Sequence, residues 1–461
     1  MFMKQRFILF VSTLVLSILF GNSALAYDFQ LDGIYYTIIS ESNKTVEVSR
    51  NKDNLYTGDL TIPSQVTKYG VTYTVTRIGD NCFLDCAKLQ SVNIPETIDS
   101  ICYNAFVWCS ALYEINIDNK NTYFQSIDGV VFDKDLTTLL HFPSAKAETY
   151  EIPDGVKIIA TESFTTNELL RSLSMPSSVI KIEKSAFYCP NLIDIQLSES
   201  LEIIAEHSFS NCSFTSIILP ESLKYIGSGA FMGCKLSSIF IPKNVEYISE
   251  DDAFSICSAL EKIEVDPKNK YYTSIDGILY DKQISKVLRC PQNIKDMEWI
   301  TLPSTITKIC RCAFHTDKTL ARIVIPSGVT TIDNGAFYYC SNLGRVVCYA
   351  KTPPSTPTED YCSSDPWEYS GRNSATLYVP KGCADIYRNF YNTTYYYSRV
   401  YPYRQFKEII EMDEDTGIHL SVDNFDEEVT RYNTHGIKIK SPQKGINIIK
   451  MSNGIIKKTI K

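Results

Sequence analysis

A pattern of 22 or 23 residues recurs through most of the 461-residue chain. In each copy a small residue precedes a phenylalanine, and in most copies a proline follows a short apolar segment. A repeat of this length is a structural unit that cannot bury its apolar face alone, so neighbouring copies must stack. The phenylalanines mark nine copies: Phe83, Phe106, Phe164, Phe187, Phe209, Phe231, Phe254, Phe314 and Phe337.

The positions of the repeat have distinct physical roles, which one central copy illustrates. Ile217 and Leu219 are two residues apart, which places both side chains on one face of a short strand that Pro220 ends. Apolar residues three apart, such as Leu223 and Ile226, are typical of a tight turn or short helix that faces the core. The small residue lets neighbouring backbones approach each other. We therefore expect the phenylalanines to stack as an aromatic spine.

The motif (I/L)-P-x-x-(V/I/L)-x-x-I-x-x-x-(A/S)-F-x-x-C-x-x-L covers about 60–349 and resembles the BspA-type leucine-rich-repeat family of bacterial surface proteins. Asn167 and Asp317 replace the cysteine in two copies, and Cys189 is shifted by one residue. The resemblance implies a curved solenoid, surface adhesion, binding of host matrix proteins in some members, and no catalytic residues. We expect a right-handed curved coil with one parallel β-sheet, short turns or helices on the other side, and β-hairpin insertions.

The segments outside the array have compositions of their own. Two basic residues, an apolar run over 7–20 and the small residues of 24–26 are typical of a secretory signal. The apolar run is short for a bilayer, and we expect no membrane span in the mature chain. The predicted organisation is a signal peptide at 1–26, an N-terminal β cap at 27–60, the repeats at 61–349, a C-terminal cap at 350–410, and an acidic linker with a small β tail at 411–461.

Two insertions interrupt the array 148 residues apart, near 118–151 and 266–301. Asp128-Gly129 and Asp276-Gly277 are each flanked by strand-like residues, so each insertion predicts a β-hairpin. Loops on a rigid scaffold often hold binding residues. The candidate ligand contacts are the aromatic residues at equivalent positions of the hairpins: Tyr123, Phe124, Tyr271 and Tyr272. Packing that only anchors the hairpins is the alternative.

Two C-terminal features each leave two interpretations open. Aromatic residues crowd 387–406, where a cap over the open end of the array is favoured over a platform for glycans. The tail divides by charge, because 411–428 holds eight acids while seven lysines and no acids follow from Gly436. It resembles C-terminal β-modules of exported proteins in the Bacteroides group, in some of which a related tail directs secretion and surface attachment. A small appended domain without a sorting role is the alternative.

Seven of the fifteen cysteines recur near one position of the repeat. Exported proteins commonly form disulfides, but equivalent positions of successive coils point inward, where a thiol packs as a small hydrophobe. We therefore expect mostly free, buried thiols in a ladder, with these members: Cys86, Cys109, Cys189, Cys212, Cys234, Cys257 and Cys340.

The residue types of known catalytic and metal sites do not assemble into a motif. The five histidines are scattered, and no G-x-S-x-G occurs. Residues 413–417 lack the glycine position and the closing glutamate of a calcium loop, and Cys310 and Cys312 are too few ligands for zinc. The net charge of -8 argues against nucleic acid as a partner. We expect no enzyme activity, no catalytic residues, no cofactor and no metal.

These observations predict a secreted or cell-surface adhesion protein that binds host extracellular-matrix or surface proteins. A glycan-binding accessory protein is one alternative. A structural surface-layer component without a specific ligand is the other.

Overall fold

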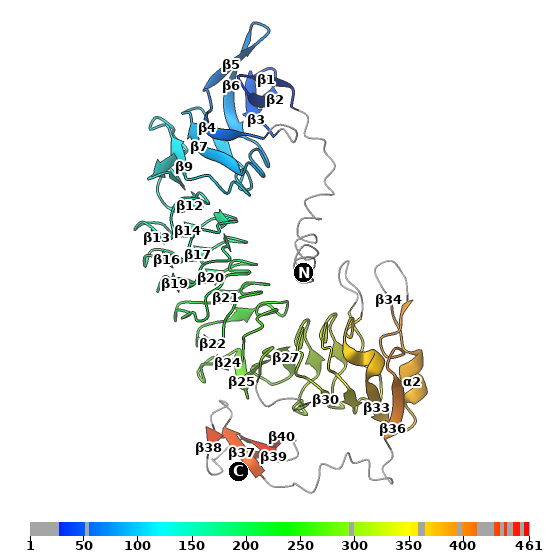
Figure 1. Cartoon of the computed structure of the whole chain (residues 1–461). Helices are drawn as coiled ribbons and strands as arrows, with labels where there is room; N and C mark the ends of the chain where they lie inside the picture. The colour runs from blue at the N-terminus through cyan, green and yellow to red at the C-terminus, as the bar shows by residue number, and fades with distance from the viewer. Residues whose placement is uncertain are drawn as a thin grey trace. The chain divides into compact units, whose positions relative to one another are not determined.

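In the computed structural model the chain forms mostly short β-strands (Figure 1). The chain forms two compact units, 1–134 and 135–461. Within the described residues the helices are the 3-10 helix η1 (Gly371–Ser374) and α2 (Ala384–Asn389). The structure describes residues 27–50, 55–294, 299–357, 365–393, 399–412, 428–433, 438–439, 446–451 and 456–460.

Unit 1 begins with a six-stranded sheet in the order β1-β2-β3-β6-β5, with β8 also beside β6. Strands β1 to β3 lie in the segment 27–60 that was predicted as a β cap. Strands β5 and β6 carry the sheet past residue 60, because β6 pairs with the second edge of β3. A parallel sheet of β4, β7 and β9 and the first hairpin complete the unit. The strands are β1 (Phe29–Leu31), β2 (Ile34–Ser40), β3 (Thr45–Val48), β4 (Thr57–Thr61), β5 (Gln65–Lys68), β6 (Val71–Ile78), β7 (Lys88–Ile94), β8 (Ser100–Ile101), β9 (Glu114–Ile117), β10 (Phe124–Ile127) and β11 (Val130–Asp133).

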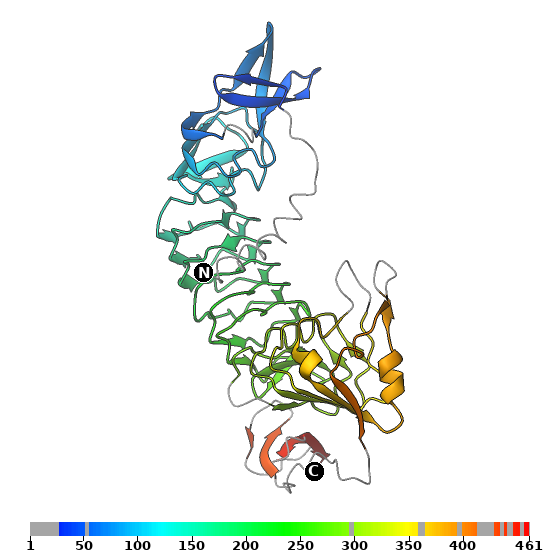
Figure 2. The same ribbon diagram turned by 45° about the vertical axis from the view of Figure 1, so that its right-hand side comes forward.

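In unit 2, successive coils contribute strands to two sets of parallel ladders, which Figure 2 shows from a second direction. The first ladder consists of β12 (Thr138–His141), β14 (Ile158–Ile159), β17 (Lys181–Ile182), β20 (Ile203–Ile204), β21 (Tyr225–Ile226) and β23 (Tyr247–Ile248). The second set consists of β13 (Thr149–Glu151), β16 (Ser172–Ser174) and β19 (Asp194–Gln196), and then of β22 (Ser238–Ile241) and β24 (Lys262–Val265).

The coils after the second hairpin continue both sets as two five-stranded sheets. One contains the hairpin itself: β25 (Tyr272–Ile275), β26 (Ile278–Asp281), β27 (Lys286–Arg289), β29 (Lys308–Ile309) and β31 (Thr331–Ile332). The other is parallel throughout: β28 (Trp299–Thr301), β30 (Arg322–Ile325), β32 (Arg345–Cys348), β33 (Thr376–Pro380) and β36 (Glu408–Met412). Helix α2 packs beside β36, where the Ala384 N–H donates to Glu411 Oε1 at 3.0 Å.

Three smaller sheets complete the described elements. The pairs are β15 (Phe164–Thr165) with β18 (Phe187–Tyr188), and β34 (Asn392–Thr393) with β35 (Arg399–Val400). The tail forms an antiparallel sheet of β37 (Glu428–Asn433), β38 (Lys438–Ile439), β39 (Ile446–Met451) and β40 (Ile456–Ile460).

The expectation of one parallel sheet is wrong, because the coils form two sets of parallel ladders. Ile226, assigned above to a turn or short helix, forms with Tyr225 one of the two-residue strands of the first ladder. Of the short turns or helices expected around the phenylalanines, the structure has turns. Residues with a left-handed backbone conformation flank the phenylalanine in most coils. Gly229 (φ 60°) and Gly233 (φ 73°), for example, flank Phe231. An α-helix requires negative φ throughout, so the chain makes a series of tight turns there instead.

The phenylalanines stack as an aromatic spine in the core. Ring centroids in unit 2 are 4.7–5.7 Å apart from Phe142 through Phe254, and Phe314 and Phe337 are 5.0 Å apart. In unit 1 Phe83 stacks on Phe106 at 5.1 Å. The small residue before each ring has a clear role: the Phe231 N–H donates to the Ala253 carbonyl of the next coil at 2.9 Å, so the two backbones touch.

Aromatic residues outside the repeat contact the first phenylalanine of the array, Phe83, and the last, Phe337. In unit 1 the Tyr56 ring meets Phe83 edge-on at 5.1 Å, and its hydroxyl donates to the Ser49 carbonyl at 2.8 Å. In unit 2 the buried Trp367 stacks on Phe337 at 4.2 Å and takes the place of a further phenylalanine. These contacts protect apolar ring faces that stacking leaves open.

Candidate functional site

Each hairpin is held by a buried asparagine, and the two asparagines occupy equivalent positions. Asn121 and Asn269 are at most 1 % exposed, and their Nδ2 atoms each donate to two carbonyls of the preceding coil at 2.8–3.2 Å. Their Oδ1 atoms accept the N–H groups of the next two aromatic residues at 2.8 Å. Each side-chain amide thus donates two hydrogen bonds and accepts two, all of them with backbone groups of the protein. These bonds fix where each hairpin begins.

The hairpin tips lie against strands of the array. The Asp-Gly turns have positive φ at both residues, as hairpins of this type require. The Gly129 carbonyl accepts from the Ile115 N–H of β9, and the Gly277 carbonyl from the Ile263 N–H of β24, both at 2.9 Å. A Cβ on Gly129 would lie 2.5 Å from the Glu114 Cβ, so glycine is needed at this contact. The hairpins therefore terminate the edges of β9 and β24.

The four aromatic candidates have different environments. Tyr123 is 55 % exposed and Tyr271 is 45 % exposed, which leaves both rings available to a ligand. Tyr272 is 8 % exposed, and its hydroxyl accepts a hydrogen bond from the Ile248 N–H at 2.7 Å. Phe124 is half-buried. Within each pair the first residue thus offers a contact surface, and the environment of Tyr272 favours an anchoring role.

Large apolar side chains are also exposed on coils between the hairpins. Ile218 is 88 % exposed and Phe240 is 47 % exposed, and the two residues occupy equivalent positions of consecutive coils. The residues around Ile217 and Leu219, predicted above as a short strand, are not assigned to a strand in the structure.

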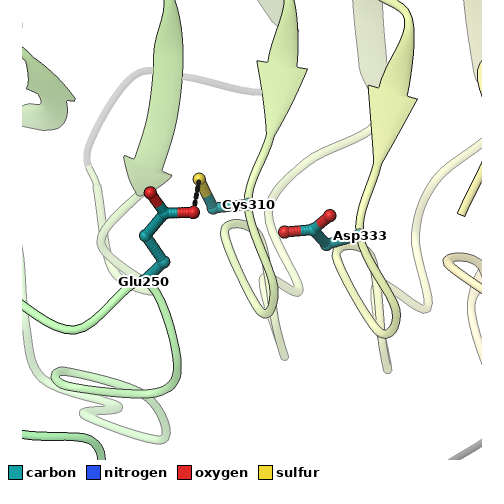
Figure 3. A group of neighbouring side chains, drawn as sticks. All are labelled: Glu250, Cys310 and Asp333. Carbon is teal, nitrogen blue, oxygen red and sulfur yellow. Dashed lines mark hydrogen bonds between the residues drawn. The ribbon is translucent and has the colours of Figure 1, made fainter. Parts of the chain in front are cut away.

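One polar cluster has the composition of a metal site. Glu250, Cys310 and Asp333 lie on different coils with their ligand atoms within 4.8 Å of one another, and the Cys310 thiol donates to Glu250 Oε2 at 3.6 Å (Figure 3). Lys308 Nζ is 2.8 Å from Glu250 and 2.9 Å from Asp333, and Lys286 Nζ is 2.5 Å from Glu250.

The neighbouring lysines decide whether this cluster can bind a metal cation. Burial alone would raise the pKa of Glu250, but hydrogen bonds from Lys286 and Lys308 hold it below its ordinary value. A metal cation would have to displace lysines that already neutralise both carboxylates. The cluster is therefore an ion-pair network that joins Glu250, before the second hairpin, to the coils after it.

The repeated cysteines form a ladder of thiol hydrogen bonds. Cys109, Cys234, Cys257 and Cys340 donate through Sγ to the phenylalanine carbonyl of the preceding coil at 2.9–3.1 Å. All fourteen cysteines in the described part of the chain are free and thirteen are buried, which confirms the expectation for them. Burial raises the pKa of Cys257 to about 11 and of Cys212 to about 12. These thiols stay protonated at neutral pH and are unsuited to nucleophilic chemistry.

Two of the three described histidines, His141 and His315, are buried, while His207 is half-buried. Burial lowers the pKa of His141 to about 4. Burial, together with the charge of Arg289, lowers the pKa of His315 to about 4. Both are therefore neutral at physiological pH. His419, His435 and the calcium-loop-like segment 413–417 lie outside the described residues.

Sequence reasoning missed several residues that shape these surfaces. Asn121 and Asn269 could have been found, because both follow an acidic residue by three positions in the segment that repeats after 148 residues. The Glu250 network could not, because Glu250 and Lys308 are 58 residues apart in no common motif. Of the described helices, none is both long and apolar enough to cross a membrane.

Comparison with known proteins places the repeats in one family. A model of the BspA type leucine rich repeat region matches in six copies, over 63–142, 140–261, 181–294 and 288–353. No curated protein matches the sequence.

Several solved bacterial structures are similar to the chain. A leucine-rich repeat protein of Eubacterium ventriosum is 20 % identical with a TM-score of 0.44, covering 77 % of each chain. A leucine-rich cell surface protein of Faecalibacterium prausnitzii is 20 % identical with a TM-score of 0.41, covering 85 % of this chain and 96 % of that one. A leucine-rich repeat protein of Bacteroides ovatus is 22 % identical with a TM-score of 0.34, covering 70 % and 94 %.

Leucine-rich-repeat proteins are in general protein-interaction scaffolds, because stacked repeats present extended binding surfaces. The matched repeats together span 63–353, more than half of the chain. This protein therefore belongs to the BspA-type leucine-rich-repeat family.

Proposed function

We propose that this protein is an exported cell-surface adhesion protein that binds host matrix or surface proteins through exposed side chains of its coils. The observation that carries the proposal is the exposure of Ile218 and Phe240 at equivalent positions of consecutive coils. Single exposed apolar residues are common, but apolar residues that recur on a rigid scaffold are typical of a protein-interaction surface.

The exposed hairpin tyrosines, one in each unit, are further proposed contacts. Tyr123 and Tyr271 each precede a more buried aromatic residue and are fixed by the amides of Asn121 and Asn269. A tyrosine ring offers apolar area and a hydroxyl at low entropic cost, because its side chain has few rotatable bonds. We assign ligand contact to these two tyrosines and anchoring to Phe124 and Tyr272.

Export is part of the same proposal. The basic and apolar pattern of 1–26, which lies outside the described residues, supports a signal peptide. Members of the family are in general bacterial surface proteins, and this supports an extracellular location for the coils.

The test is a binding assay with immobilised residues 27–461 against purified matrix proteins and mucins. We expect saturable capture of at least one protein ligand, and substantial loss of it in the Ile218→Ser/Phe240→Ser variant. Ile386→Ser is the matched control, because Ile386 is 51 % exposed on α2, away from those coils. Capture that the double variant retains in full would reject these coils as the contact surface. Binding on a glycan array without any protein ligand would reject the proposed class of ligand.

A further inference from the structure

The five-stranded parallel sheet after the second hairpin has one outward row of unusual composition. Ile300, Ile323 and Val346 are buried, so residues one position away along β28, β30 and β32 face outward. The row beside them contains Trp299, Arg322 and Arg345 in register on three neighbouring strands. Neighbouring strands of a sheet lie about 4.8 Å apart, so the backbones of Arg322 and Arg345 are separated by about this distance.

Aromatic rings hold both guanidinium groups. The Arg322 guanidinium carbon is 4.4 Å from the centroid of the Trp299 ring, and that of Arg345 is 5.2 Å from the centroid of the Tyr378 ring. Trp299 remains 42 % exposed. Cation–π contact restrains each guanidinium without using its N–H donors.

The arginine pair lacks the acidic partner that other basic residues of the coils have. Lys224 pairs with Glu202, Lys243 with Glu221 and Arg171 with Glu148, at 2.9–3.5 Å. Within the described ranges no carboxylate makes an ion pair with Arg322 or Arg345.

This arrangement carries an electrostatic cost. Like charges directly opposite each other on neighbouring strands destabilise a sheet. Burial, followed by the charge of Arg345, lowers the pKa of Arg322, and its Nε is buried without a hydrogen-bond partner. The chain has a net charge of -8, yet no carboxylate of the described residues neutralises these two guanidinium groups. A bound anion would supply the missing negative charge.

We propose that Arg322 and Arg345 form a docking site for an acidic segment of the protein partner, whose carboxylates bind the two guanidinium forks. The inference rests on the proposed protein-binding function. The side chains around the pair favour a peptide over a glycan as the source of the anion. Trp299 and Tyr378 lie against the two arginines, and tryptophan, tyrosine and arginine are the residues that dominate protein–protein contact energies.

The probe is a fluorescent random copolymer of glutamate and tyrosine, titrated with residues 27–461 and followed by fluorescence anisotropy. We expect binding that weakens with added salt, whereas any binding of the matching lysine–tyrosine copolymer to this acidic chain should not depend on Arg322 and Arg345. The Arg322→Gln/Arg345→Gln variant should bind the acidic copolymer at least about tenfold more weakly, since hydrogen bonds to charged groups contribute enough for such a change.

The matched control is Arg171→Gln/Arg388→Gln, which removes the same formal charge from two arginines that already pair with Glu148 and Asp385. Equal loss of binding in both double variants would overturn the proposal, because net charge would then explain it. So would heparin binding tighter than the copolymer with the same dependence on Arg322 and Arg345, since the ligand would be a glycan.

Folding and the broader function are checked separately. The glutamine variant should melt at or above the temperature of the unmodified protein, because it relieves repulsion on the sheet surface. If the acidic copolymer does not bind while matrix proteins are still captured through Ile218 and Phe240, the docking site is wrong and the adhesion function stands. If neither binds, both proposals fail.

Discussion

The hydroxyl of Tyr272 accepts a hydrogen bond from the backbone N–H of Ile248 at 2.7 Å. Ile248 belongs to β23, the last strand of the first ladder, whose N–H has no following coil strand to donate to. The tyrosine thus supplies, from the second hairpin, the acceptor that a further strand would have supplied. The equivalent residue of the first hairpin, Phe124, has no hydroxyl, so the two hairpins dock differently although their sequences repeat.

Replacing Tyr272 with phenylalanine should lower the free energy of unfolding by about 1–3 kcal/mol, because a buried N–H loses its acceptor. Urea denaturation followed by circular dichroism measures the change. Tyr271→Phe is the matched control, and its exposed hydroxyl should matter by less than about 0.5 kcal/mol. Equal stability of both variants would contradict an anchoring role for Tyr272.

The spine should be sensitive to the loss of one ring. Phe231 lies between Phe209 and Phe254 at centroid distances of 5.7 and 5.6 Å, so Phe231→Ala should leave a cavity that costs about 3–5 kcal/mol. Phe240→Ala in the same region is the control, since that ring is already half in solvent. A melting temperature of Phe231→Ala no lower than that of Phe240→Ala would argue against the stacked core.

The cysteine ladder should resist alkylation in the native state and react after denaturation. Cys212, Cys234 and Cys257 are buried, and burial raises the pKa of all three thiols. Mass spectrometry after iodoacetamide treatment, with and without urea, measures the difference. Peptides linked by disulfides between these positions in non-reduced protein would show that the ladder is oxidised instead.

The same thiols make stability depend on alkaline pH. A thiol with an ordinary pKa of 9.0 ionises in the unfolded chain, whereas Cys212 in the folded chain stays protonated until about pH 12. The stability that these thiols contribute is therefore complete below pH 9 and is lost progressively as the pH rises towards 12. Cys212→Ala should show a smaller loss between pH 8 and pH 10.5 than the unmodified protein, measured by urea denaturation. An identical loss would exclude the contribution of Cys212.

Acid should destabilise the protein through its buried histidines. The pKa of His141 is about 4 in the folded chain, against an ordinary value of 6.5. The unfolded chain binds a proton between these values while the folded chain does not, so stability falls as the pH drops from 6.5 towards 4. His141→Gln should lose less stability between pH 7 and pH 4.5 than the unmodified protein. The same pH dependence in both would assign acid sensitivity to other groups.

The tail should be dispensable for folding. Strands β37 to β40 pair only with one another in the described part of the chain, so deleting 428–461 should leave the melting temperature of the repeats unchanged. If the tail directs sorting, the truncated protein should accumulate in the periplasm, which cell fractionation detects. Normal surface display of the truncated protein would leave only the appended-domain interpretation.

The sequence by itself determined which residues form the core. Phe231, Cys234 and Ile226 recur every 22 or 23 residues, and a repeat of fixed length brings equivalent residues together whatever the details of each turn. The Asp-Gly pairs likewise determined the hairpins, because their positive φ angles select one kind of turn.

Only the tertiary structure decided the features that the repeat does not specify: the ladder partners, the residues that cover the spine, and the pairing of outward side chains. The strand at Ile226 was not predicted because its ladder partners come from other coils, and local spacing alone resembles a helical turn. Trp367 and Tyr56 cover the spine from segments with no repeat, so nothing in their surroundings indicates the contact. Arg322 and Arg345 become a pair only through strand register. Neighbouring coils fix that register by backbone hydrogen bonds, to which the side chains that face outward contribute nothing.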